Sequence, residues 1–252
     1  MKIKFTEIFL KTMVRLFGAK GFSKMYAATS TSKAYAKFCE RVYGRDLCQA
    51  NMMDEEQLQF LLDKLQLNEN HDVLDLGCGI GKISEYISDV TKAKVTGIDF
   101  AFGAIEQAQQ RTNQIKFVVG NLNNLKELVH EKYDVIALID SLYFVDDIHN
   151  YIMTLRRFLK PGGTIAIFYT SSANPNKVQE ILSLQNFTFC SHDFTANERK
   201  IWERSLIVAE ELKEEFIKEK NIEIYKGRIS EAKRNINAQK TNTIFRYLYL
   251  IK

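Results

Sequence analysis

Between residues 54 and 170 the chain alternates short apolar runs with longer stretches in which apolar residues recur every three or four positions. Continuous apolar runs are typical of strands buried on both faces of a sheet, and the second pattern is typical of amphipathic helices. The run Tyr133 to Ile139 is the clearest strand, and the stretch that begins at Asp54 is the clearest helix. This alternation predicts a doubly wound, mostly parallel α/β sheet of the Rossmann-like type.

Capping residues and helix-breaking residues set the expected bounds of these helices and strands. Asp54, followed three positions later by Gln57, has the pattern of a capping box, and the run 160–163 (Lys-Pro-Gly-Gly) is a strong helix stop. The strands expected in the core are 72–76, 94–98, 115–119, 133–139 and 164–169. The helices expected after the first four strands are 81–90, 103–111, 124–130 and 147–159.

The regular alternation ends after residue 170. A helix at 176–185 and a strand at 187–193 precede a long polar helical stretch at 196–236, and a β-rich segment follows at 243–251. We predict that the core consists of residues 54–195 and 241–252. The N-terminal segment 1–53 and the late insertion 196–240 would then form two parts of one helical cap over the carboxyl ends of the strands.

The first residues have a pattern of their own. Apolar residues recur there at helical spacing, which favours a helix that caps the domain, with a membrane-surface helix as the alternative. Glu7, Lys11 and Arg15 interrupt the apolar run, so no stretch is long enough to span a bilayer. The apolar positions are Phe5, Ile8, Phe9, Met13, Leu16 and Phe17.

Composition narrows the class of protein. The formal net charge of +4 is spread along the 252 residues and forms no basic stripe, so we expect no nucleic-acid partner. The four cysteines include no CxxC pair and no histidine at zinc-finger spacing, which argues against disulfides and against a structural metal. We therefore expect a reduced, cytoplasmic protein with no metal.

The stretch 73–82 (VLDLGCGIGK) places three glycines directly after an apolar run. Glycine has no Cβ, so such a strand-to-helix turn brings backbone N–H groups close to a nucleotide-like ligand. Ligands of open α/β sheets bind at the carboxyl ends of the strands. Here these ends carry Asp75 with its glycines, Asp99 with Phe100, Asn121 with Leu122, and Asp140 with Ser141.

These residues suit an adenosine-like ligand. The Asp99 carboxylate can accept hydrogen bonds from both ribose hydroxyls, and the Asn121 side-chain oxygen can accept from an adenine amino group. Phe100 and Leu122 could sandwich the adenine ring. A cationic end of the ligand would suit Asp75, whereas a pyrophosphate there would be repelled.

The motifs VLDLGCGIG, GIDF, GNLNNL, YDVIALIDSLYFV and FLKPGGTIAIF together resemble class I S-adenosylmethionine-dependent methyltransferases over residues 54–170. Dinucleotide-binding dehydrogenases instead favour GxGxxG, with the third glycine one place later. The resemblance implies S-adenosyl-L-methionine as cofactor and S-adenosyl-L-homocysteine as product. It departs at Asn121, where the family often has an acidic residue. It assigns the cofactor to Asp75, Gly77, Cys78, Gly79, Gly81, Asp99, Phe100, Asn121, Leu122 and Asp140.

Absent motifs favour the small-molecule branch of this family. The chain has no Asp/Asn-Pro-Pro-aromatic motif, no glutamate pair like that of arginine methyltransferases and no Asp-Asn magnesium site. We expect methylation of a small acceptor, with nitrogen slightly favoured over oxygen or carbon. The alternatives are a non-catalytic cofactor-binding sensor or partner subunit, and a methyltransferase for a macromolecule. By analogy with related enzymes, the segment before Asp54 would close over the methionyl end through Tyr43, Gln49 and Asn51.

Two residues are candidates for catalysis. His192 could act as a general base because its unperturbed pKa lies near neutrality. Tyr143 follows the fourth core strand and would reach the acceptor. The other candidates on the acceptor side are Phe144, Tyr169, Asp193, Trp202, Tyr225 and Arg228.

Overall fold

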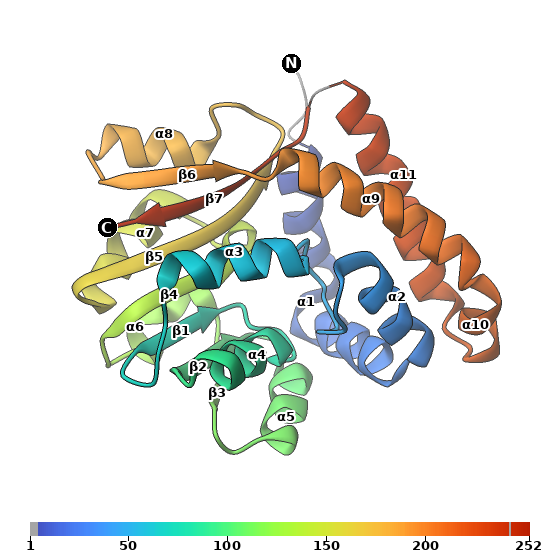
Figure 1. Cartoon of the computed structure of the whole chain (residues 1–252), viewed down its shortest axis with the longest axis horizontal. Coiled ribbons are helices and arrows are strands. Elements are labelled where there is room, and N and C mark those ends of the chain that lie inside the picture. Colours follow the sequence, from blue (N-terminus) through green and yellow to red (C-terminus); the bar gives the residue numbers. More distant parts are fainter. Residues whose placement is uncertain (1–4, 242) are drawn as a thin grey trace.

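The computed structural model describes residues 5–241 and 243–252, with side chains from residue 18 onward (Figure 1). These residues form one seven-stranded sheet in the order β3-β2-β1-β4-β5-β7-β6. β7 runs antiparallel to its neighbours β5 and β6, and the other strands all point the same way. The strands are β1 (Asp72–Leu76), β2 (Lys94–Asp99), β3 (Lys116–Val119), β4 (Tyr133–Ile139), β5 (Leu159–Ser171), β6 (Phe189–Asp193) and β7 (Phe245–Ile251).

Helices cover both faces of this sheet because alternate strand residues point to opposite sides. Val73 belongs to the hydrophobic core under α3 (Glu55–Leu65), α4 (Lys82–Thr91) and α5 (Phe102–Arg111). Leu74 and Leu76 belong to the other core, under α6 (Leu125–Leu128), α7 (Ile148–Leu155) and α8 (Lys177–Leu184). The mostly parallel Rossmann-like sheet predicted from the sequence is therefore confirmed.

The remaining helices pack together beside the sheet, on the right in Figure 1. They are α1 (Phe5–Thr31), α2 (Lys33–Tyr43), α9 (Thr195–Glu211), α10 (Lys213–Lys218) and α11 (Ile222–Lys240). Tyr35 and Phe38 of α2 share a third hydrophobic core with Trp202 of α9, Phe216 of α10 and Ile229 of α11. Segments far apart in sequence, from both ends of the chain, thus form one helical layer, which we call the cap.

Polar contacts join the two parts of the cap. The Ser32 hydroxyl donates to Glu219 at 2.6 Å, and the Lys37 ammonium lies 2.6 Å from a Glu215 carboxylate oxygen. α1 is kinked at Gly18, whose φ is 51°. The apolar helix face expected at residues 5–17 lies outside the side chains that the structure describes. Of the helices described, none has the length and apolar character of a membrane span.

Local signals in the sequence placed most elements within two residues of their observed bounds. Asp54 caps α3 by accepting a hydrogen bond from the Gln57 amide at 3.0 Å, as predicted. Three expectations were wrong. The helix expected at 147–159 ends at Leu155, and β5 begins at Leu159 rather than at residue 164. The helical stretch expected at 196–236 is divided into α9, α10 and α11 and ends at Lys240. Leu159 pairs with Tyr133 before a register shift in β5, so the Pro-Gly-Gly run lies inside the strand.

Candidate functional site

Three glycines form the turn between β1 and α4. Gly77, Gly79 and Gly81 have φ values of 83°, 56° and 82°, in the left-handed region where a Cβ causes strain. A Cβ on Gly77 would stand 2.3 Å from the Cβ of Ser141, and one on Gly81 would stand 2.6 Å from the ring of Phe117. Backbone conformation and close packing therefore both require glycine at these alternate positions.

Asp75 lies beneath this turn and is only 2% exposed. The hydroxyl of Ser84, on the first turn of α4, donates to its carboxylate at 2.6 Å. Burial raises the pKa of Asp75 to about 6, although the Ser84 hydrogen bond acts in the opposite direction. A cationic group at the turn would favour the ionised form of this carboxyl.

Asp99 ends β2 beside the same turn. One carboxylate oxygen accepts from the Gly79 amide at 2.8 Å, and the other accepts from the Ala101 amide at 2.8 Å. Burial raises the pKa of Asp99, while these amide bonds lower it. Each carboxylate oxygen has two acceptor positions. Asp99 can therefore fix the turn and still accept from ligand hydroxyls.

Helix α1 lies against the glycine turn and the start of α5, which sequence analysis did not foresee. The hydroxyl of Tyr26 stands 2.4 Å from the position of a Cβ on Gly79. The Gly103 amide, in the first turn of α5, donates to the Ser23 hydroxyl at 3.1 Å. Burial, followed by the Asp99 charge, raises the pKa of Tyr26 well above its usual value. Tyr26 therefore brings a protonated phenol to this edge of the sheet.

Aromatic rings gather where the sequence predicted an adenine sandwich. The Phe22 ring of α1 lies 5.2 Å from the Phe100 ring and 5.7 Å from the Phe144 ring, centroid to centroid. Leu122 is buried in the core under α6, α7 and α8, and Asn121 is exposed and accepts a hydrogen bond within its own turn. Phe100 thus lies between two rings, those of Phe22 at 5.2 Å and Phe144 at 6.0 Å, and its predicted sandwich of adenine with Leu122 stays a prediction.

Asp140 directly follows β4, with a φ of 53°, and is held by residues distant in sequence. Its two oxygens accept from both terminal nitrogens of Arg246, on β7, at 2.7 and 2.9 Å. The Met52 amide donates to it as well, at 2.9 Å. Arg246 is fully buried and also donates to Gln57 on α3 and Thr170 on β5. The Asp140 carboxylate thus already accepts from Arg246 and Met52, and its predicted contact with the cofactor stays a prediction.

Tyr143 belongs to the same buried network. Its hydroxyl donates to Asp140 at 3.3 Å and accepts from the Thr170 amide at 2.5 Å, while its ring stacks on Tyr169 at 4.9 Å. Burial, followed by the Asp140 charge, raises its pKa well above its usual value. The Tyr143 hydroxyl thus already has both a donor and an acceptor partner among protein groups.

Glu198 connects this network to the cap. Its carboxylate accepts from the Thr170 hydroxyl at 2.9 Å and from the Trp202 indole at 3.0 Å. Burial raises the pKa of Glu198, and the nearby Arg246 charge lowers it. Neither Arg246 nor Glu198 stands in a motif, so no sequence signal marked them.

The segment before Asp54 is the one predicted to close over the cofactor. Its side chains Tyr43, Gln49 and Asn51 contact residues of the same segment. Tyr43 is 1% exposed and packs on Phe38 inside the cap. The Gln49 side chain bonds to backbone groups of the same loop, and Asn51 accepts from the Met53 amide at 3.0 Å. The loop meets the carboxyl edge of the sheet through the Met52 amide, and the predicted contacts of the three side chains with the cofactor stay predictions.

His192 lies far from the glycine turn. It pairs in register with Leu248 of β7, which pairs with Phe168 of β5, which in turn pairs with Ile139 of β4. Three strand spacings of about 4.8 Å separate β6 from β4, and β1 lies one spacing further on. A general base has to lie within hydrogen-bond reach of the group it deprotonates, so this separation argues against the predicted role of His192.

The other predicted residues also have protein partners. The Asp193 carboxylate accepts a hydrogen bond from the amide of Thr195, the first residue of α9, at 2.8 Å. Tyr225 donates to Glu210 at 2.8 Å, and Arg228 lies 2.7 Å from Glu231, both within the cap. Cys78 lies in the glycine turn, with its sulfur 2.8 Å from the position of a Cβ on Gly97.

Comparison with known proteins places residues 74–167 in a family described as a methyltransferase domain. A phosphoethanolamine N-methyltransferase of Triticum aestivum is 30% identical over 152 residues, 59% of this chain and 30% of the relative. The methyltransferase GfsG of Streptomyces halstedii is 28% identical over 119 residues, 45% of this chain and 42% of the relative. The chain thus spans less than half the length of these curated relatives.

Solved structures share the fold at low sequence identity. The Haemonchus contortus phosphoethanolamine N-methyltransferase 2, in complex with phosphomonomethylethanolamine and S-adenosylhomocysteine, superposes with a TM-score of 0.69 at 16% identity. That match covers 91% of this chain and 59% of the other. The cyclopropane synthase MmaA2 of Mycobacterium tuberculosis gives 0.70 at 16% identity, covering 92% and 98%.

Proposed function

We propose that this chain, which has the class I methyltransferase fold and matches a methyltransferase family over residues 74–167, transfers a methyl group from S-adenosylmethionine to a small acceptor. One observation carries the proposal. Asp99 and Asp75 lie buried on either side of a turn whose three glycines all have left-handed backbone. This arrangement supports a ligand with ribose hydroxyls and a cationic amino-acid end.

The described residues fit the cofactor. Asp99 would accept from the ribose hydroxyls, Asp75 would favour the ammonium, and Gly77, Gly79 and Gly81 would admit the ligand to the backbone. The exposed side chain of Asn121 would accept from the adenine amino group. When bound, S-adenosylmethionine supplies a methyl group on a positively charged sulfur.

The residues of α1 would shield the reacting atoms from water. Methyl transfer is an in-line displacement that needs a nucleophile close to the methyl carbon and aligned with the sulfur. Tyr26 and Phe22 stand over the glycine turn and Phe100, so they would close the site above the cofactor. The wheat relative, named a phosphoethanolamine N-methyltransferase, supports an amine acceptor.

We assign no general base to this reaction. His192 lies too far from the turn, and Tyr143 keeps its proton because burial and Asp140 oppose its loss. An amine acceptor therefore has to enter the site as the neutral free base. In this proposal Tyr143 is a positioning residue that keeps Asp140 and the end of β5 in place.

Isothermal titration calorimetry of the full chain with S-adenosylmethionine and S-adenosylhomocysteine tests the cofactor. We expect Asp99→Asn to raise Kd about 100-fold, because two hydroxyls lose a charged acceptor worth about 3 kcal/mol in total. Asp89→Asn is the matched control, since Asp89 is exposed at the far end of α4. If folded wild-type protein binds neither ligand, the proposed function fails.

A turnover assay separates an enzyme from a non-catalytic binding protein. The protein is incubated with methyl-labelled cofactor and a metabolite extract, and labelled products are identified by mass spectrometry. We expect a labelled small molecule whose formation falls in Asp99→Asn and persists in Asp89→Asn. Cofactor binding without any labelled small molecule would overturn the proposed acceptor class and leave the two alternatives, a non-catalytic binding protein and a methyltransferase for a macromolecule.

A further inference from the structure

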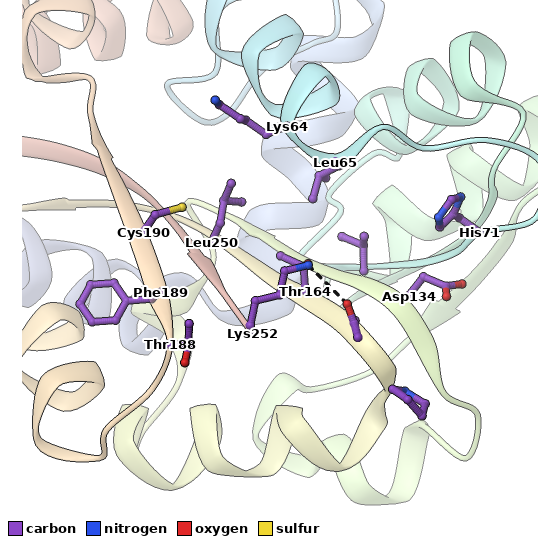
Figure 2. Close-up of a pocket in the computed structure, with 14 residues that line it drawn as sticks. Lys64, Leu65, His71, Asp134, Thr164, Thr188, Phe189, Cys190, Leu250 and Lys252 are labelled. Atoms are coloured by element: carbon purple, nitrogen blue, oxygen red, sulfur yellow. Dashed lines mark hydrogen bonds between the residues drawn. The ribbon is translucent and has the colours of Figure 1, made fainter.

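A second pocket lies at the opposite end of the strands from the glycine turn (Figure 2). Its volume is about 640 Å³, within the size range of sites that hold small ligands. It is bordered by the C-terminal turn of α3, by the start of β4, by residues 161–163 (Pro-Gly-Gly) of β5 and by the first residues of β6. None of the residues assigned to the cofactor lines it.

The pocket contains an exposed thiol. Cys190 is the exposed cysteine of the four, since Cys39 and Cys48 are buried and Cys78 is partly covered. Its sulfur lies 3.7 Å from Nε2 of His192, two residues further along β6 and on the same face of the strand. A thiol therefore has an imidazole within reach of its proton.

The imidazole is fixed in place by α3. The Phe60 ring packs on the His192 ring edge to face at 4.7 Å, and the Lys64 ammonium lies over the same Phe60 ring at 5.2 Å. Partial burial, followed by the Lys64 charge, lowers the pKa of His192. At neutral pH the imidazole is therefore uncharged and can accept a proton.

Positive charge predominates around the pocket. Lys64 and Lys252 both line it, and Figure 2 shows them on the same cavity as Cys190. The Lys252 ammonium donates to neutral oxygens, those of Thr164 at 2.7 Å and Gly162 at 3.3 Å, and so keeps its net charge. The Asp134 carboxylate at the pocket lies 2.7 Å from the Lys160 ammonium, which it shares with Asp72 at 2.5 Å.

From this juxtaposition we propose that Cys190 is a modification site, which takes a small disulfide bearing carboxylates and forms a mixed disulfide with it. The Cys190 thiol transfers its proton to Nε2 of His192, and the resulting thiolate attacks one sulfur of the bound disulfide. That S–S bond breaks, a new S–S bond forms to Cys190, and the other half leaves as a thiolate that takes the proton. The small disulfide is the oxidant and is itself reduced by this exchange. Lys64 and Lys252 attract and bind its carboxylates.

The site is separate from the proposed cofactor site. Cys190 is in register, strand by strand through Leu250, Ala166 and Ala137, with Asp75 of β1. Four strand spacings place the thiol about 19 Å from Asp75. The modification therefore needs no bound cofactor, and its test is independent of the proposed function.

The test compares two probe disulfides on the full native chain. One is 5,5′-dithiobis(2-nitrobenzoate), which carries carboxylates, and the other is the uncharged 4,4′-dithiodipyridine. We expect one thiol to react in a fast phase with the anionic probe, and we expect Cys190→Ser to remove that phase. His192→Gln should slow the reaction with both probes, because the thiol loses its proton acceptor.

The charge requirement is tested by Lys64→Gln and Lys252→Gln. Each should slow the anionic probe at least about threefold, the range of one partly exposed charge pair, and leave the uncharged probe unchanged. Lys126→Gln, an exposed lysine on α6, is the matched control and should change neither rate. Mass spectrometry after incubation with glutathione disulfide should find one glutathionyl group, on Cys190. A fast phase that survives Cys190→Ser, or equal losses with both probes in the lysine variants, would overturn the proposal.

Discussion

Arg246 offers the sharpest test of how the carboxyl edge of the sheet is held together. Its guanidinium is 0% exposed and donates to Asp140, Gln57 and Thr170. We predict that Arg246→Gln greatly destabilises the fold. The substitution leaves the Asp140 carboxylate, whose side chain is 10% exposed, without its cation.

The magnitude follows from the stranded charge. Removing one partner of a buried ion pair costs about 3–5 kcal/mol, because the other charge keeps its desolvation penalty. That is a large part of the roughly 5–15 kcal/mol that separates folded from unfolded domains. The Met52 amide and the Tyr143 hydroxyl still donate to Asp140, so we expect about 3 kcal/mol, the lower end of that range.

Urea unfolding followed by fluorescence measures this loss. Trp202 is the single tryptophan, and its indole donates to Glu198 in the same network, so its emission reports the region directly. Arg204→Gln is the control: that side chain is 45% exposed and lies 3.5 Å from Asp54. Because Arg204 is largely exposed and Asp54 keeps the Gln57 amide as a donor, losing this pair should cost less than about 1 kcal/mol.

A double variant separates a stranded charge from lost packing. Asp140→Asn removes the charge that Arg246→Gln leaves behind, so the double variant should be more stable than the sum of the single losses by about 1–3 kcal/mol. A loss below about 1 kcal/mol in Arg246→Gln would refute the reasoning. Simple additivity in the double variant would refute it as well.

Two further predictions concern the glycine turn. Gly79→Ala should lower the free energy of unfolding by about 1–3 kcal/mol, because φ is 56° and the new Cβ meets the Tyr26 hydroxyl. Thermal unfolding measures this, and an unchanged Tm would contradict it. Asp75, whose folded pKa of about 6 exceeds its unfolded value, stabilises the protein at low pH and loses that contribution as pH rises. Between about pH 4 and about pH 6 the unfolding free energy of wild type should therefore fall by roughly 2–3 kcal/mol relative to Asp75→Asn, and parallel pH curves would contradict this.

The sequence by itself determined the elements and the class of site. Apolar periodicity and caps are local, so β1, β4 and the N-cap of α3 could be predicted from a few adjacent residues. The glycine spacing was equally informative, because each glycine of the turn has a positive φ and a neighbouring side chain that leaves no room for a Cβ. Asp75 and Asp99 followed, since the ends of parallel strands meet at one edge of the sheet.

Only the tertiary structure decided which side chains meet at that edge. Arg246 contacts Gln57 across 189 positions of sequence, and no periodicity specifies such a pair. The strand order places β6, and with it His192, three strands away from β4 and four from the glycine turn after β1. The packing of α1 against α5 places Tyr26 beside that turn. Local patterns fix which residues form each helix and strand. The partner of a buried charge or ring depends on how those elements pack, and that is settled by the whole chain at once.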